Sequence, residues 1–203
     1  SCSNNPTRQP QKTVKEPSKE ITEETKDSAY YLTQAKQNYV LTNNIYQRND
    51  YLIQAAEALQ LEQQCEKSIR VIEVLQPELQ DNRHITHGKL ILAECYLVLS
   101  DNVYAKVEAI LANLTGDYGY QSRISALEAQ LNVNQKQWLR AAKALQSTDI
   151  EEPKKTQTIW KWVNKLTLSE LEKARLSETS LQPWLQLALI VKRFALESEL
   201  FSK

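Results

Sequence analysis

The chain has little of several residue types, and each shortage excludes a class of protein. Three glycines in 203 residues leave little material for the tight turns of hairpins or for phosphate-binding loops. Equal numbers of basic and acidic residues, 25 of each, provide no basic surface for nucleic acid. No apolar run is long enough to span a membrane. These shortages favour an all-α chain that neither binds nucleic acid nor spans a bilayer.

The chain also lacks methionine and begins with Ser1-Cys2, as we expect of a processed or trimmed product. Only two histidines are present, so serine–histidine–carboxylate and cysteine–histidine catalytic sets have little material, and the sequence shows neither. We therefore expect no enzyme activity and no cofactor.

A repeat with a period near 34 residues organises the middle of the sequence. Glu57, Glu94 and Glu128 recur at offsets of 37 and 34 residues, and three apolar residues follow them at a constant distance of 17, namely Val74, Leu111 and Leu145. A unit of two helices with this period is the tetratricopeptide spacing. The second unit fits best, with Leu92, Ala93, Tyr96, Ala105 and Ala112 at the expected positions. We predict stacked tetratricopeptide-like hairpins that form a short superhelix.

Signals at helix ends define the rest of the folded region, 27–203. Asp27 is the predicted N-cap of the first helix, and Asp50 that of the next. The apolar helix from about 85 to 99 should be the most buried element. Ser169 with Glu172 predicts a capping box. The last helix, which starts near 183, should cap the array with an inward stripe of Trp184, Leu187, Ala188, Val191 and Ala195.

Cys2 is the most informative single residue. A cysteine at the N-terminus, followed by a polar, proline-bearing segment, is typical of a mature bacterial lipoprotein whose thiol carries diacylglycerol. Residues 3–26 hold three prolines and two large apolar residues, so we expect a disordered tether there. The alternative is a fortuitous cysteine in a disordered tail. We predict lipidation at Cys2 and a domain division at residue 26.

The two remaining cysteines could form a disulfide, and the two histidines could bind a metal ion. Cys65 and Cys95 are expected to be buried thiols in adjacent repeats, with a disulfide as the open alternative. His84 and His87 have a metal-compatible spacing, but the sequence provides no third ligand nearby. We expect a solvated pair near a helix start and no metal site.

Two further features concern the C-terminal third. Trp160 and Trp162 are two residues apart and cannot share a helix face, so we expect one in the core and the other exposed at an interface. The other two tryptophans should pack between the third hairpin and the cap; they are Trp138 and Trp184. Glu197-Ser198 is similar to the Glu-Ser pair of lytic transglycosylases, but the chain holds no catalytic domain after it.

These features together resemble the N-terminal domain of the LpoA family of penicillin-binding protein activators. The resemblance covers about residues 27–203 and rests on Cys2 with its tether, the segment 28–32 (SAYYL), the hairpins, and the C-terminal pattern of Trp160, Leu166, Leu171 and 181–187 (LQPWLQL). The family usually has a glycine before the tryptophan in that last segment, where this chain has Pro183.

The resemblance implies an outer-membrane lipoprotein that faces the periplasm and stimulates the transpeptidase of a bifunctional class A penicillin-binding protein. It also implies a larger C-terminal domain, similar to periplasmic binding proteins, which provides most contacts with the synthase and is not contained in these 203 residues. This chain would serve as spacer and docking module.

Two alternatives remain open at this point. The chain fits a generic tetratricopeptide-like periplasmic adaptor lipoprotein, and it also fits the helical part of a peptidoglycan lyase. No partner-binding residues can be assigned from the sequence, because degenerate repeats often lose the usual groove.

Overall fold

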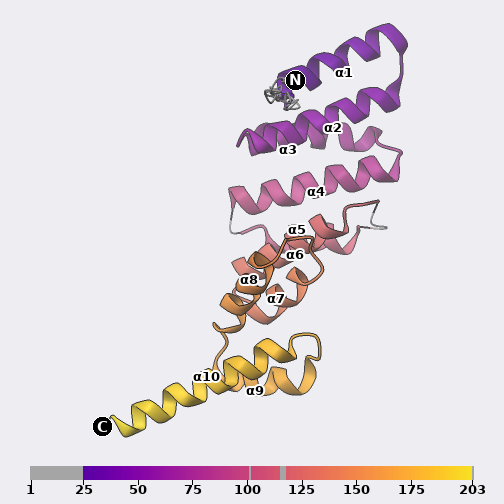
Figure 1. The fold of residues 1–203 in the computed structure, drawn as a ribbon. Helices are drawn as coiled ribbons and strands as arrows, with labels where there is room; N and C mark the ends of the chain where they lie inside the picture. Colours follow the sequence, from indigo (N-terminus) through magenta and orange to yellow (C-terminus); the bar gives the residue numbers. More distant parts are fainter. Residues whose placement is uncertain (1–24, 101, 115–117, 203) are drawn as a thin grey trace, which may run out of the picture.

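The computed structural model describes residues 25–100, 102–114 and 118–202, and this part of the chain is all-helical. The elements are α1 (Ser28–Thr42), α2 (Ile45–Leu61), α3 (Cys65–Leu75), the 3₁₀-helix η1 (Gln76–Glu78), α4 (Asn82–Leu99), α5 (Tyr104–Ala112), α6 (Gln121–Asn134), α7 (Trp138–Leu145), α8 (Lys154–Val163), α9 (Leu168–Ser177) and α10 (Gln182–Phe201). They stack into an elongated array that has α1 at one end and α10 at the other (Figure 1). None of these helices is long and apolar enough to cross a lipid bilayer. The predicted fold class is confirmed.

Contacts between residues 34 apart show how the hairpins stack. The Gln60 amide donates to Glu94 Oε2 at 2.7 Å, and the amide of Gln146 donates to the Ser180 carbonyl at 2.9 Å. Ser28 and Glu62 are joined by two hydrogen bonds over the same separation. Residues about one repeat apart in the sequence are therefore in contact, as expected when each hairpin packs against the next.

The turns inside two hairpins repeat the same geometry. Gln63, between α2 and α3, and Lys136, between α6 and α7, both have positive φ, at 62° and 58°. In each turn the residue after it donates its backbone N–H to a carbonyl five residues earlier, at 2.8 Å. This pattern satisfies the last carbonyls of the first helix without a glycine. The first and third hairpins therefore share one turn geometry.

The apolar core is divided along the array. One cluster joins α2, α3 and α4, a second joins α4 to α5 and α6, and a third joins the helices from α6 to α10. Helix α4 takes part in the first two and has eight buried residues, more than any other described helix. Its predicted status as the most buried element is confirmed.

The helix caps agree with the sequence in one case and differ in two. Asp27 caps α1 by accepting from the Tyr30 N–H, as predicted. Helix α2 begins earlier than predicted and is capped by Asn44, so the cap at Asp50 is wrong. The capping box of α9 is formed by Thr167 and Glu170, two residues before the predicted pair, Ser169 and Glu172. Both sets have the same spacing, and the one whose first residue is in extended backbone forms the cap.

The predicted inward stripe of α10 is correct for Trp184 and Ala188 and wrong for its other three residues. The helix buries Leu185, Ala188 and Leu189, whereas Leu187 and Val191 are exposed. The buried face is rotated by about 100°, one residue, from the predicted one. The error arises because α10 is apolar on two sides, so its periodicity alone did not identify the buried side.

A disulfide joins Cys65 at the start of α3 to Cys95 in α4, with 5.2 Å between their Cα atoms. Both residues are buried in the first core cluster. The expectation of two free buried thiols is therefore wrong, and the alternative is correct. The bond links the first and second hairpins covalently, across a sequence separation of 30.

The disulfide should contribute strongly to stability. Closing a loop of this length is expected to stabilise the folded state by about 3–4 kcal/mol through the lost entropy of the unfolded chain. In a Cys2→Ser background, thiol titration in denaturant should find no free thiol before reduction and two after it. Reduction should lower the free energy of unfolding by about that amount. Two titratable thiols before reduction would contradict the bond.

Candidate functional site

Helices α2, α4 and α6 are the first helices of the three hairpins, and α4 packs directly against both of the others. Their shared surface carries a polar cluster on successive turns. We call the set formed by Glu57, Gln60, His87, Glu94 and Arg123 the A-helix cluster. It is the most connected polar assembly that spans more than one hairpin in the described part of the chain.

Arg123 on α6 is the centre of this cluster. Its Nε and Nη2 each donate to Glu94 at 2.7 Å, so the guanidinium grips that carboxylate with two bonds. Its Nη1 donates to Glu57 on α2. One side chain therefore connects all three hairpins. A planar guanidinium suits this task because its donors point in fixed directions.

Glu57 and Glu94 occupy the same position of the predicted repeat, and in the structure both carboxylates bind Arg123. Stacking brings both carboxylates to Arg123, and Gln60 also donates to Glu94. The third member of the series, Glu128, is exposed and takes no part. Sequence reasoning missed Arg123. The signal was available, because two equivalent carboxylates on neighbouring helices repel each other unless a cation lies between them.

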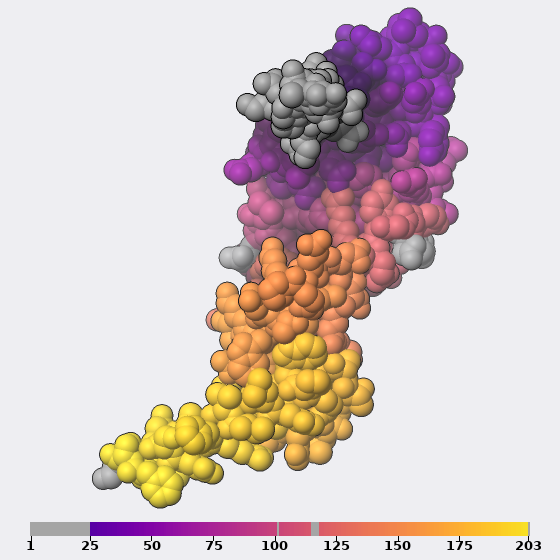
Figure 2. Space-filling view, in the orientation of Figure 1, coloured from indigo at the N-terminus to yellow at the C-terminus, as the bar shows by residue number. Residues whose placement is uncertain are grey.

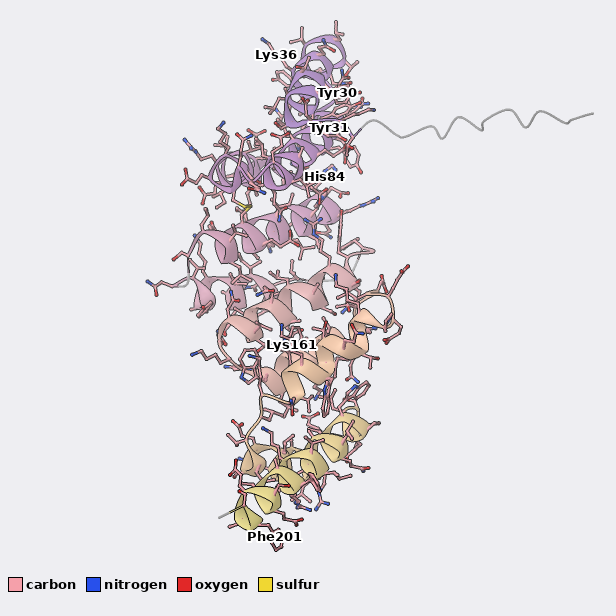
Figure 3. The ribbon with its side chains drawn as sticks, turned by 60° about the vertical axis from the view of Figure 1, so that its left-hand side comes forward. Tyr30, Tyr31, Lys36, His84, Lys161 and Phe201 are labelled. Carbon is pink, nitrogen blue, oxygen red and sulfur yellow. A yellow bond between two sulfur atoms is a disulfide. The ribbon has the colours of Figure 1, made fainter. Side chains whose placement is uncertain are left out.

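The two histidines lie on the same surface, and neither is solvated as expected. His84 is buried and its Nε2 lies 3.2 Å from Asp50 Oδ1; the His87 Nε2 lies 3.1 Å from Glu57 Oε2. An ionised carboxylate only accepts, so each ring carries a proton on Nε2. The His84 ring also stacks on Tyr46, and the His87 ring on Tyr120. In Figure 3, His84 is labelled on the same side of the array as Tyr30 and Tyr31 of α1.

The electrostatics of the cluster favour the charged forms. The hydrogen bond from His87 has the largest effect on Glu57 and, with the charge of Arg123, lowers the pKa of that carboxyl from 4.5 to about 2 despite burial. Burial would lower the pKa of the Arg123 guanidinium, but its bonds to Glu94 and Glu57 raise it above the ordinary value. Glu57 and Arg123 are therefore both charged at neutral pH.

A pocket of about 500 Å³ opens beside the cluster. Its walls include side chains of α1, α2 and α4 and the residue that precedes α6, among them Tyr31, Gln54, Arg83, His84, His87 and Tyr120. Aromatic rings and convergent polar groups of this kind hold polar ligands or peptide segments. Within the described residues, each histidine's printed hydrogen bond is to a carboxylate and not to a hydroxyl or thiol.

The other predicted site residues are distributed along the chain. Cys2 lies outside the described residues. Groups of three possible metal ligands are absent from the described part. All four tryptophans are partly buried and pack around the third core cluster. The predicted packing of Trp138 and Trp184 is therefore confirmed. The prediction that one of Trp160 and Trp162 is exposed is wrong. Glu197 and Ser198 are exposed on α10, where the Ser198 hydroxyl donates to the Phe194 carbonyl.

The fold and this surface define a class: short tetratricopeptide-like superhelices built from stacked helical hairpins. Within that class, solved structures of LpoA from Haemophilus influenzae are similar to this chain. A full-length LpoA structure matches 81% of this chain at a TM-score of 0.59 and 20% identity, and the isolated LpoA N-terminal domain matches 88% at 0.54 and 20% identity. The predicted resemblance is confirmed at the level of the fold.

The extent of the match differs between the two kinds of structure. This chain covers 84% of the N-terminal-domain structure but 31% of full-length LpoA. No model of a known protein family matches the sequence, and no curated protein is detectably similar to it. The likeness therefore concerns the architecture of one domain.

Removal of Arg123 should destabilise the array. Arg123→Met leaves Glu57 and Glu94 facing each other, partly buried and without their cation, which should cost on the order of 2 kcal/mol. Arg140→Met is the matched control, because Arg140 is exposed and bonds to Gln137 alone among its described contacts. It should change stability by less than about 0.5 kcal/mol. Urea unfolding measures both, and equal effects would contradict the role of the cluster.

The acid dependence of stability should identify Glu57. Its folded pKa, about 2, lies below the ordinary 4.5, so its contribution is complete above about pH 5 and is lost as the pH falls towards 2. The difference in unfolding free energy between the wild type and Glu57→Gln should shrink over this window. Unfolding titrations at several pH values measure that difference. A constant difference from pH 6 to pH 3 would contradict the assignment.

Proposed function

We propose that the chain is the helical spacer and docking module of an LpoA-like outer-membrane lipoprotein. In this proposal the protein is not an enzyme and regulates peptidoglycan synthesis by activating a bifunctional class A penicillin-binding protein. The observation that carries the proposal is the match to the LpoA N-terminal domain, because it extends over 88% of this chain and 84% of that domain.

The architecture supports a spacer role. Three hairpins and the following helices stack in one direction, so the array gains length without a large core (Figure 1). The disulfide and the A-helix cluster both join successive hairpins, which stiffens the first half of the array. A stiff array would hold a second domain at a fixed distance from the end of the tether.

The anchor in this proposal is a lipid on Cys2, followed by a tether over residues 3–26. A tether of 24 residues spans about 27 Å as a coil and at most about 80 Å when fully extended. The tether would leave the array free to orient between the membrane and the synthase. Contacts with the synthase would be made mainly by a C-terminal domain that this chain does not include, with the pocket on α1, α2 and α4 as the docking surface that the array itself offers.

The lipid anchor is tested in the full-length protein, expressed in the bacterium from which it comes. Cys2→Ala should move the protein from the membrane fraction to the soluble fraction, because the thioether cannot form. Ser3→Ala, one residue away, should leave it in the membrane. Mass spectrometry of the membrane form should find a triacylated cysteine. Unchanged membrane retention of Cys2→Ala would overturn the anchor.

The regulatory role is tested separately with purified components. The full-length Cys2→Ala protein should still stimulate transpeptidation by its synthase in detergent solution, where no reach is needed, yet fail to complement a deletion in cells. If Cys2→Ala stimulates the synthase in solution but fails to complement in cells, the anchored array acts by placing the activator close to the synthase. Absence of stimulation by the full-length protein in solution, with a synthase from the same organism, would overturn the function itself.

A further inference from the structure

The pocket beside the A-helix cluster contains charges of both signs, and its two carboxylates are already hydrogen-bonded. Asp50 Oδ1 lies 3.2 Å from His84 Nε2, and its Oδ2 accepts from the Gln54 amide at 2.5 Å. Both oxygens of Glu57 are bonded within the A-helix cluster. Each carboxylate oxygen of the pocket therefore has a donor from the protein itself and needs none from a ligand.

Two cations line the same pocket without a carboxylate partner. Lys26 and Arg83 are exposed and form no ion pair among the described residues. The Tyr30 hydroxyl raises the pKa of the Lys26 ammonium, and the Tyr120 hydroxyl raises the pKa of the Arg83 guanidinium, so each cation lies beside a hydroxyl instead of a carboxylate. The positive groups of the pocket are thus available to an anionic ligand.

The two cations are attached near opposite ends of the pocket. Lys26 lies near the end of α2, because Ser28, two residues further on, bonds to Glu62. Arg83 lies near the first half of α2, because the histidine that follows it contacts Asp50. The α2 side chains that line the pocket extend over 11 positions (61 − 50), which is a rise of about 16 Å. A peptide of about five extended residues spans the same distance.

Aromatic and aliphatic side chains make up much of the remaining wall. They include Tyr31, Tyr120, Ala58 and Leu61, and Leu61 is 77% exposed. The volume, about 500 Å³, is large enough for several side chains and exceeds what a small anion needs. Cations and apolar surface in one groove fit a chain that alternates acidic and apolar residues, because alternate side chains of an extended chain face opposite sides.

We propose that this pocket binds an acidic peptide segment of a partner protein, extended along α2, with its carboxylates on Lys26 and Arg83 and an apolar side chain against Leu61. The pocket belongs to α1, α2 and α4, at the opposite end of the array from α10 (Figure 2). The inference rests on the proposed docking role of the array and names the chemistry of the segment that would dock there.

The probe is a blocked peptide, Glu-Leu-Glu-Leu-Glu, and its control carries glutamine in place of each glutamate. It is titrated into the 203-residue chain, with Cys2→Ser to prevent intermolecular disulfides, and followed by NMR. Signals around Lys26, Arg83 and Tyr120 should shift with a Kd of roughly 0.1–1 mM. The glutamine peptide should bind about tenfold more weakly. Salt should weaken binding of the acidic peptide, because the pairs are exposed and therefore screened.

Variants of the two cations test the site. Lys26→Gln and Arg83→Gln should each weaken peptide binding about threefold, and the two together about tenfold. Lys36→Gln is the matched control, because Lys36 is exposed on α1 and does not line the pocket; it should bind like the wild type. Circular dichroism shows that each variant is folded. An equal loss in Lys36→Gln overturns the assignment to this pocket.

Three glutamates that precede the pocket in the sequence could compete with the peptide. Replacing Glu20, Glu23 and Glu24 by glutamine should leave binding as tight as in the wild type or tighter. Weaker binding by this variant would contradict a site that is open to external carboxylates.

The remaining outcomes separate the ligand class from the proposed function. Equal binding of the acidic and glutamine peptides overturns the anionic ligand. Inorganic phosphate that displaces the peptide at equal concentration overturns the peptide and assigns the cations to small anions. A chain that binds neither peptide overturns this inference and leaves the proposed function standing, because stimulation of a synthase is measured separately with the full-length protein. Lack of stimulation with intact peptide binding overturns the proposed function alone.

Discussion

A hairpin of two short amphipathic helices cannot bury its apolar face by itself, and the whole array depends on that constraint. Helices α3, α5 and α7 have 8 to 11 residues each, too few for independent stability. Each hairpin must therefore rest on the next, and the core is divided into three clusters that share helices. An interaction that joins two successive hairpins therefore stabilises both hairpins, and not only the residues that form it.

Two such interactions lie at the same end of the array and act through different physics. The Cys65–Cys95 disulfide restricts the unfolded chain, and its contribution does not depend on salt or pH. The A-helix cluster acts in the folded state, where Arg123 offsets two carboxylates that stacking forces together. Beyond α6 the described residues show single ion pairs, such as Lys143 with Glu178, in place of a charge cluster, and the tryptophan-rich third cluster joins α7 to α10 by apolar burial. The array therefore has a polar, cross-linked half and an apolar half.

Much of this organisation could be predicted from the sequence, since it depends on local periodicity. The burial of α4 and the cap at Asp27 follow from spacing within one or two helical turns, and the period near 34 follows from the recurrence of such local patterns along the chain. The cluster could be predicted in part: Glu57 and Glu94 were matched by repeat position, but Arg123 lies 66 residues from Glu57 and belongs to no repeat series. Pairing of Cys65 with Cys95 requires a Cα separation that only the stacked structure supplies.

The misplaced stripe of α10 has a different cause, and it bears on how the array ends. A terminal helix of a solenoid normally buries one face and presents polar residues on the other. Helix α10 does bury one face, over Leu185 and Leu189, and to that extent it caps the third core cluster. Its other face is also apolar, so the periodicity is compatible with either face being buried. The contacts with α8 and α9 determine which face is buried in the structure. Local periodicity therefore identifies α10 as a helix that covers the third core cluster, but it does not identify which of its two apolar sides faces that cluster.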